Sequence, residues 1–170
     1  MDLDQAMTDL LENSGDRLLR LAYQLSHDRS SAEDLVQEAL TQVYRSWRRR
    51  APEIAHAEAY VRRAIVNEYL RRRRLRSASE VITDELPEPP IPGNFDDELA
   101  ERERVWHALA MLPPRQRTVL VLRYYEALPD HEIAALIGAK ETTVRSLAAR
   151  ALAALRSGEL AFVPVQDGRS

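Results

Sequence analysis

The segment between Glu132 and Arg156, EIAALIGAKETTVRSLAARALAALR, carries side chains that are suited to reading duplex DNA. At helical spacing, its second half places guanidinium, hydroxyl and methyl groups on one side: Thr142, Arg145, Ser146, Ala149, Ala153 and Arg156. Arginine can donate hydrogen bonds to guanine or phosphate, and alanine or threonine methyl groups can contact a thymine methyl. These residues alone favour DNA binding only slightly over an αα-hairpin with an ordinary solvated face.

Two helices must position that polar side. Ile133, Leu136 and Ile137 recur at helical spacing, and Gly138 suits the position after a helix end, where φ is positive. The second helix has its own apolar stripe, formed by Val144, Leu147, Ala148, Ala151 and Leu155. This order predicts a helix-turn-helix unit whose second helix lies in the major groove.

The composition argues against other kinds of site. The chain has 170 residues, 45% hydrophobic and 30% charged, which is typical of a globular protein. It has no cysteine, so it has no disulfide, thiolate zinc site or cysteine nucleophile. Its four histidines, His27, His56, His107 and His131, fit no metal-ligand spacing, and no glycine-rich phosphate loop occurs. We therefore predict no enzyme activity, no cofactor and no metal site.

Charge and proline divide the chain. Residues 77–101 contain eight acidic residues and no basic residue, and their four prolines, Pro87, Pro89, Pro90 and Pro92, forbid a continuous helix. We predict an extended acidic linker there. The blocks on either side, 1–76 and 102–156, are mildly basic, and nearly all of the positive charge is arginine. That charge fits phosphate recognition, and genomic base composition explains it equally well.

Both blocks have helical periodicity. The first contains a helix over Leu18–Leu25 with room for an earlier start, a second helix with a Ser30–Glu33 capping box, and a third helix that ends in arginines. The expected core positions of the last two are Val36, Leu40, Val43, Trp47, Val61, Ala64, Ile65 and Tyr69. After the linker we expect one helix closed by Pro113 and Pro114, a helix over RQRTVLVLRYYEAL, and the hairpin. The sequence predicts an all-α fold: two small helical domains, 1–76 and 102–157, the linker, and a loose tail, 158–170.

The N-terminus is acidic and lacks a long apolar run, so we predict neither a signal peptide nor a membrane anchor. The expected compartment is the cytoplasm.

Four segments in order closely resemble one family. They are AEDLVQEALTQVYRSW, AYVRRAIVNEYLRRRR, LPPRQRTVLVLRYYEAL and the hairpin, with the acidic segment between the second and the third. This set resembles the extracytoplasmic-function type of bacterial RNA polymerase sigma factor, nearest to its short, SigE-like group. The resemblance implies a non-catalytic specificity subunit with a sigma-2 type bundle and a sigma-4 type helix-turn-helix. It would recruit core RNA polymerase and open promoter DNA.

The resemblance also implies residue roles in the first domain. DLVQEAL would dock on the clamp helices of the largest polymerase subunit through Asp34, Gln37 and Glu38, which could also form an ordinary solvated face. YVRRAIVNEYL would read the minus-ten promoter element as single-stranded DNA. Asn67 aligns with a position near a flipped-out base, or is a surface amide. Arg62, Arg63, Arg71 and Arg72 would hold the phosphates.

The hairpin resembles the reader of the minus-thirty-five element. The residues implied there are Lys140, Thr142, Thr143, Arg145, Ser146 and Arg150, with Arg115 and Arg117 gripping the DNA backbone nearby. The sequence departs from the family pattern at four positions. Lys140 replaces a capping serine, Thr142 a common glycine, Leu147 a frequent polar residue, and Pro129 a serine that often begins the first hairpin helix.

Two other classes stay open at this point. One is a stand-alone helix-turn-helix regulator, and the other is an interaction protein whose basic faces are incidental. The segments DLVQEAL and YVRRAIVNEYLRRRR count against both, because neither class needs them. The partners that we expect are core RNA polymerase and promoter DNA. An anti-sigma factor is a candidate that the sequence neither requires nor opposes.

Overall fold

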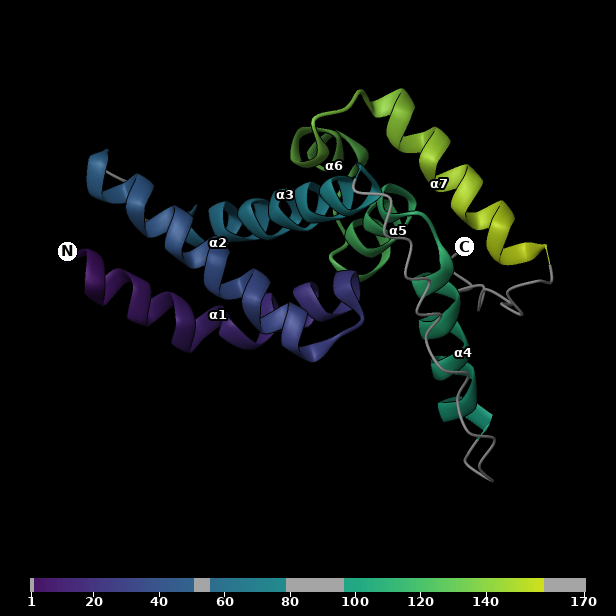
Figure 1. Ribbon diagram of the computed structural model, residues 1–170, viewed down its shortest axis with the longest axis horizontal. Helices are drawn as coiled ribbons and strands as arrows, with labels where there is room; N and C mark the ends of the chain where they lie inside the picture. Colours follow the sequence, from purple (N-terminus) through teal and green to yellow (C-terminus); the bar gives the residue numbers. More distant parts are fainter. Residues whose placement is uncertain (1, 51–55, 79–96, 158–170) are drawn as a thin grey trace, which may run out of the picture.

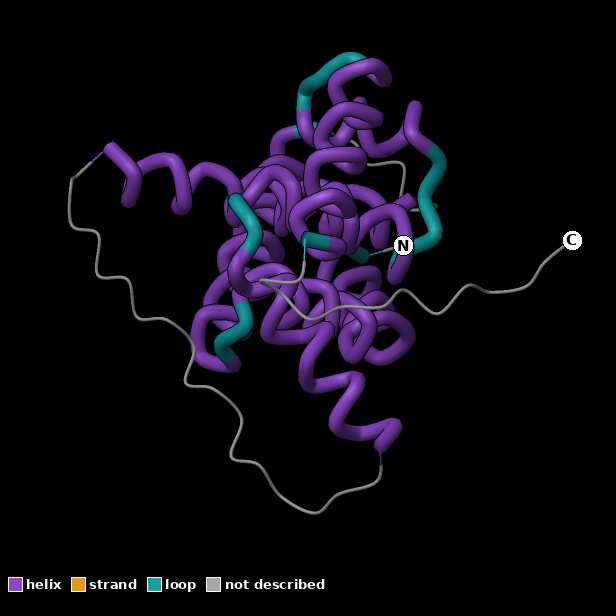
Figure 2. Tube along the Cα trace, turned by 90° about the vertical axis from the view of Figure 1, so that its right-hand side faces the viewer, coloured by secondary structure: helices purple, strands orange, loops and turns teal. Residues whose placement is uncertain are grey.

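A computed structural model describes residues 2–50, 56–78 and 97–157 of the chain. These residues form helices and connecting turns, and the described part contains no strand (Figure 2). The helices are α1 (Leu3–Ser26), α2 (Arg29–Arg49), α3 (Ala57–Ala78), α4 (Asp97–Met111), α5 (Pro114–Leu120), η2 (Val121–Tyr125), α6 (Asp130–Ile137) and α7 (Glu141–Arg156). The predicted all-α class is therefore confirmed.

The first three helices pack on one another, and α7 packs on α5 and α6 (Figure 1). The two groups also touch, because α3 contacts α5 and α6 while α1 contacts α5. One continuous hydrophobic core runs through both groups, from Leu18 and Leu21 of α1 to Val144 and Leu155 of α7. Most of the predicted core positions are buried, and Leu40 and Ala64 pack against the core while remaining partly exposed.

The helix ends correct one prediction about capping. The N-cap of α2 is Asp28, whose Oδ2 accepts hydrogen bonds from the Ser31 amide at 2.9 Å and from the Ser31 hydroxyl at 2.7 Å. Glu33 instead lies 3.2 Å from the Arg29 guanidinium. The predicted Ser30–Glu33 capping box is therefore wrong, because an aspartate two residues earlier takes the capping role.

The ends of the other helices follow the sequence more closely. Gly138 ends α6 with φ 66°, as its residue type predicts. Lys140 precedes α7 and its side chain makes no capping bond, so the expected serine cap is missing. Helix α1 begins at Leu3, well before Leu18. His27 ends α1 with φ 57°, a left-handed conformation that histidine adopts more readily than most residues.

The expected helix after Pro114 changes type partway. Helix α5 ends at Leu120 and continues as the π-helical turn η2, whose last bond joins the Glu126 amide to the Val121 carbonyl at 3.2 Å. Such turns insert one residue into a helix and shift the side chains that follow. Within this turn Val121 and Leu122 are buried, whereas Tyr124 and Tyr125 are exposed.

The predicted linker limits both fall inside helices, since α3 continues to Ala78 and α4 begins at Asp97. Pro87, Pro89, Pro90 and Pro92 lie outside the described residues, and so does the tail from residue 158.

Candidate nucleic-acid and polymerase interfaces

The polar side of α7 is open to solvent. Lys140, Thr142, Arg145, Ser146 and Arg150 are exposed and Thr143 is half-buried, while the apolar stripe opposite is buried against α5 and α6. Arg145 is held only loosely, since its Nη1 lies 3.8 Å from Oε2 of Glu141 and both side chains are more than half exposed. A duplex could therefore reach this face without moving the core.

Leu147 explains one departure from the family pattern. Its side chain is 8% exposed and belongs to the buried stripe with Val144 and Ala148. A polar side chain at position 147 would have to turn out of this hydrophobic stripe. Leu147 therefore packs α7 against its neighbours, and its replacement of a polar residue does not remove a DNA contact.

An exposed stripe on α3 carries the predicted single-strand contacts. Arg63, Asn67 and Arg71 follow one another at four-residue spacing, and all three are exposed. Tyr60 extends this stripe by one turn, is 48% exposed, and meets the Trp47 ring edge-on with centroids 6.1 Å apart. An exposed aromatic ring beside cations suits base stacking. Tyr60 was not among the predicted contacts, although its spacing from Asn67 could have identified it.

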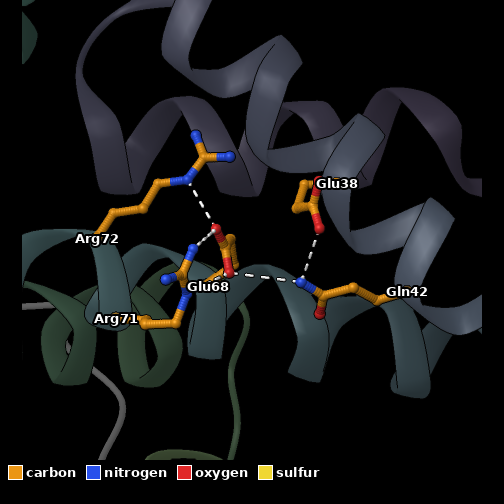
Figure 3. A network of polar contacts seen from close by, with 5 residues as sticks. All are labelled: Glu38, Gln42, Glu68, Arg71 and Arg72. Carbon is orange, nitrogen blue, oxygen red and sulfur yellow. Dashed lines mark hydrogen bonds and ion pairs between the residues drawn. The ribbon is translucent and has the colours of Figure 1, made fainter.

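Glu68 lies beside this stripe and joins two of the predicted phosphate-binding arginines (Figure 3). Oε2 accepts from Arg71 Nε at 2.9 Å, and Oε1 accepts from Arg71 Nη2 at 2.8 Å and from Arg72 Nε at 2.9 Å. Gln42 of α2 approaches Oε2 at 3.5 Å and donates to Glu38 at 3.1 Å. The hydrogen bonds from Arg71 and Arg72 lower the pKa of Glu68 to about 2, against the opposing effect of desolvation.

Arg62 and Arg63 are adjacent in sequence but differ in environment. Arg63 is exposed, whereas the Arg62 side chain is 20% exposed and its Nη1 lies 3.8 Å from Oε2 of Glu126, just beyond η2. The Arg62 Nε is buried without a hydrogen-bond partner. Arg62 is therefore less accessible to a phosphate than Arg63.

The position of Arg117 contradicts its predicted contact with DNA. It was expected to grip the DNA backbone, but it is 4% exposed and its guanidinium lies inside the protein. It donates to the carbonyls of Leu25, Leu109, Ala110 and Leu112 and to the Tyr69 hydroxyl, at 2.6–3.1 Å. An arginine has five N–H groups, so this set occupies all of its donors. In this arrangement Arg117 has no donor left for a phosphate, whereas its neighbour Arg115 is exposed.

The surroundings explain why a cation is tolerated there. Its carbonyl partners lie in the last turn of α1, in the last turn of α4 and directly after α4, and carbonyl groups at helix C-termini carry partial negative charge. Desolvation lowers the pKa of Arg117, but an arginine remains protonated in proteins. This role could not be predicted from the sequence, because spacing along α5 does not show which helix ends lie nearby.

The predicted polymerase contacts share one side of α2. Asp34 and Gln37 are exposed, and Glu38 is half-buried and bonded to Gln42. Val36, Val43 and Trp47 are buried on the opposite side, so Asp34 and Gln37 have no part in the core.

The described residues contain no cluster of His, Asp and Glu that could hold a metal ion. None of their helices is both long and apolar enough to cross a membrane.

Comparison with known proteins assigns both groups of helices. Residues 10–79 match the family described as Sigma-70 region 2, and residues 102–155 match Sigma-70, region 4. The chain is 39% identical over 141 residues to the RNA polymerase sigma-E factor of Streptomyces coelicolor, which covers 83% of this chain and 78% of the relative. It is 34% identical over 144 residues to the ECF RNA polymerase sigma factor SigE of Mycolicibacterium smegmatis, covering 81% of this chain and 55% of that relative.

A solved structure supports the fold. The sigma factor RpoE of Bartonella quintana, crystallised in complex with the anti-sigma factor NepR, matches with a TM-score of 0.66 at 24% identity. The match covers 90% of this chain and 94% of that chain.

Proposed function

The chain belongs to the sigma-70 family of RNA polymerase sigma factors, in its extracytoplasmic-function group, and we propose how its surfaces divide the work of transcription initiation. Helix α2 docks on core RNA polymerase through Asp34, Gln37 and Glu38. Helix α3 holds the single-stranded minus-ten element, and α7 reads the minus-thirty-five element in the major groove. The protein acts as a specificity subunit in the cytoplasm and catalyses no reaction itself.

The observation that carries this proposal is the exposure of three polar faces on helices whose opposite sides are buried. The faces of α2, α3 and α7 lie on separate helices, so each could contact a different partner. On α3, we propose that Tyr60 stacks on a base and Asn67 pairs with a base edge, while Arg63, Arg71 and Arg72 hold phosphates. On α7, Arg145 and Ser146 contact base edges, while Lys140, Arg150 and the two threonines contact bases or phosphates. Arg115 adds a backbone contact.

We propose a division of the chain that follows these roles. Residues 1–76 bind polymerase and the minus-ten element, and residues 102–157 bind the minus-thirty-five element. Between them, 77–101 connect the two readers. Both ends of this connector are helical, because α3 continues to Ala78 and α4 begins at Asp97.

In vitro transcription tests the proposal. The chain is mixed with core RNA polymerase and a library of genomic fragments, and transcript ends are mapped. Specific initiation that needs both components is expected. A footprint on duplex DNA by the chain alone, with no comigration with core polymerase on gel filtration, would instead identify a stand-alone helix-turn-helix regulator.

An anti-sigma factor is a further proposed partner. The sigma factor of Bartonella quintana that shares this fold was crystallised with one. A partner of this kind would suppress transcription in the reconstituted reaction, and restoring transcription by adding more of this chain would show that it acts by titration.

A further inference from the structure

Glu68 is a nearly buried carboxylate to which the polymerase and DNA assignments give no role. It is 3% exposed although it lies on α3 directly after the exposed Asn67. A carboxylate this well covered must have hydrogen-bonding partners, because desolvation otherwise disfavours its charge. Its partners are the two arginines that follow it by three and four residues, Arg71 and Arg72.

The geometry of these contacts fixes the arginines rather than merely neutralising them. Arg71 uses two nitrogens, Nε and Nη2, on the two oxygens of Glu68, which is the bidentate arrangement that holds a guanidinium in one plane. Arg72 is held through Nε alone at 2.9 Å. Figure 3 shows both guanidinium groups turned toward the same carboxylate.

Both arginines remain accessible. The Arg71 side chain is 53% exposed and that of Arg72 is 35% exposed, so a phosphate can still approach them. An arginine has five N–H groups, and Glu68 occupies two from Arg71 and one from Arg72. Glu68 thus leaves N–H groups of both anchored side chains unused, and Arg71 belongs to the exposed stripe that includes Asn67.

The carboxylate itself is held from a second helix. Gln42 of α2 approaches its Oε2 at 3.5 Å and also donates to Glu38 at 3.1 Å. The first contact is at the long limit of a hydrogen bond and the second is ordinary, so Gln42 supports Glu68 only weakly. The strong part of the network is the carboxylate and its two arginines.

We infer that Glu68 is a positioning residue for promoter opening: it fixes Arg71 and Arg72 in the orientation in which they hold the phosphates of the separated strand beside Asn67. This inference rests on the proposed minus-ten role of α3. A positioned cation loses less side-chain entropy on binding than a free one. The negative charge of Glu68 also lowers the attraction of this surface for DNA in general. Glu68 therefore favours the specific open complex over random duplex.

Two opposite effects test the inference. In Glu68→Gln the arginines lose their anchor and the surface gains a positive charge. We expect affinity of the free protein for random duplex to rise about threefold at low salt. We expect promoter opening by the holoenzyme, measured by permanganate reactivity of unpaired thymines, to fall about tenfold. A merely structural loss would lower both quantities, and a pure charge effect would raise both, so either pattern overturns the inference.

Glu68→Asp separates geometry from charge. It keeps the charge but is one methylene shorter, so it cannot reach both arginines as Glu68 does. Random-duplex affinity is expected to stay at the native value while opening falls. Native opening by Glu68→Asp would overturn the inference. Glu12→Gln is the matched control, because it removes an exposed carboxylate on α1 that contacts none of these residues.

A combined variant identifies the route of the effect. If Glu68 acts through the arginines, Glu68→Gln should change opening little in a protein that already carries Arg71→Ala and Arg72→Ala. A full additional loss there would overturn the inference. Failure of the proposed function looks different: the native chain would then not open any promoter with core polymerase.

Discussion

Arg117 Nη1 donates a hydrogen bond to the Tyr69 hydroxyl at 2.9 Å and so joins α5 to α3. The same Nη1 reaches the Leu25 carbonyl of α1 at 2.9 Å, while the other nitrogens bond to the carbonyl groups of Leu109, Ala110 and Leu112 at the end of α4. A single buried cation therefore connects the helices of the region 2 match to those of the region 4 match.

Arg117→Met is expected to destabilise the protein strongly. The change leaves five acceptors without their donor, four of them in buried contacts, and each buried polar group left unpaired costs roughly 1–3 kcal/mol. Chemical denaturation measures the free energy of unfolding. Arg115→Met is the control, since Arg115 is exposed and an exposed site should change stability by less than about 0.5 kcal/mol.

For DNA binding the order of the two variants should be reversed, with Arg115→Met having the larger effect. Loss of a phosphate contact at Arg115 should lower the salt slope of DNA binding by about one. If Arg117→Met were as stable as Arg115→Met and bound DNA more weakly, Arg117 would be a phosphate contact after all.

His27 gives the same region a dependence on pH. Its ring lies 3.9 Å, centroid to centroid, from Trp106 of α4, and both ring nitrogens are buried without partners. Desolvation, with repulsion from Arg117 and His107, lowers the pKa of His27 to about 3. The unfolded chain has an ordinary pKa near 6.5, so below that pH it binds a proton that the folded chain excludes. The stability that neutral His27 contributes is therefore fully present above a pH of about 6.5 and is lost as the pH drops toward 3.

The expected loss from this group between pH 7.5 and 5.5 is roughly 1 kcal/mol. His27→Asn is the comparison, because asparagine tolerates the left-handed backbone and does not titrate. Denaturation curves at both pH values should show a smaller loss for the variant. An equal loss would mean that other groups carry the pH dependence.

The helices were predictable because their signals are local. The stripe of Val144, Leu147 and Ala148 and the glycine at Gly138 were read correctly from spacing and residue type. The predicted Ser30–Glu33 cap was wrong because Asp28, two residues earlier, is also a capping residue type and binds the Ser31 amide and hydroxyl. The π-helical turn after Leu120 has no comparable signature in composition.

The environment of the site residues was harder to predict, because it depends on contacts distant in sequence. Spacing placed Asn67 and Arg71 correctly on one exposed stripe. It could not show that Arg117 meets Leu25, ninety-two residues earlier, or that Arg62 faces Glu126. These contacts follow from packing α5 and η2 against α1 and α3.

Arg145→Ala is expected to weaken promoter binding by roughly 1–3 kcal/mol, as for a lost base contact. Arg145 is exposed on α7 and its contact with Glu141 is long, at 3.8 Å, so little stability should be lost. Footprinting on a mapped promoter measures protection of the upstream element. Arg104→Ala, an exposed arginine on α4, is the control, and equal protection in both variants would remove Arg145 from the reading face.

A double change of Asp34 and Gln37 to alanine is expected to reduce affinity for core polymerase at least about tenfold, equivalent to 1.4 kcal/mol. Both residues are exposed opposite the buried side of α2, so the unfolding temperature should hardly change. Fluorescence titration with core enzyme measures the affinity. Native affinity in a correctly folded variant would contradict the docking role.

Asn67→Ala is expected to impair promoter opening more than closed-complex formation. Asn67 is exposed on α3 and can meet an unpaired base only after the strands separate, so its contact energy belongs to the open state. Loss of one base contact should reduce the open fraction by about tenfold, with footprint affinity for the closed complex nearly unchanged. Permanganate reactivity measures opening, and footprinting at low temperature measures closed binding.

Arg145→Ala provides the comparison, because its duplex contact exists before opening and its loss should appear already in the closed complex. If Asn67→Ala lowered closed binding and left opening normal, Asn67 would contact duplex DNA, and the assignment of α3 to the separated strand would be wrong.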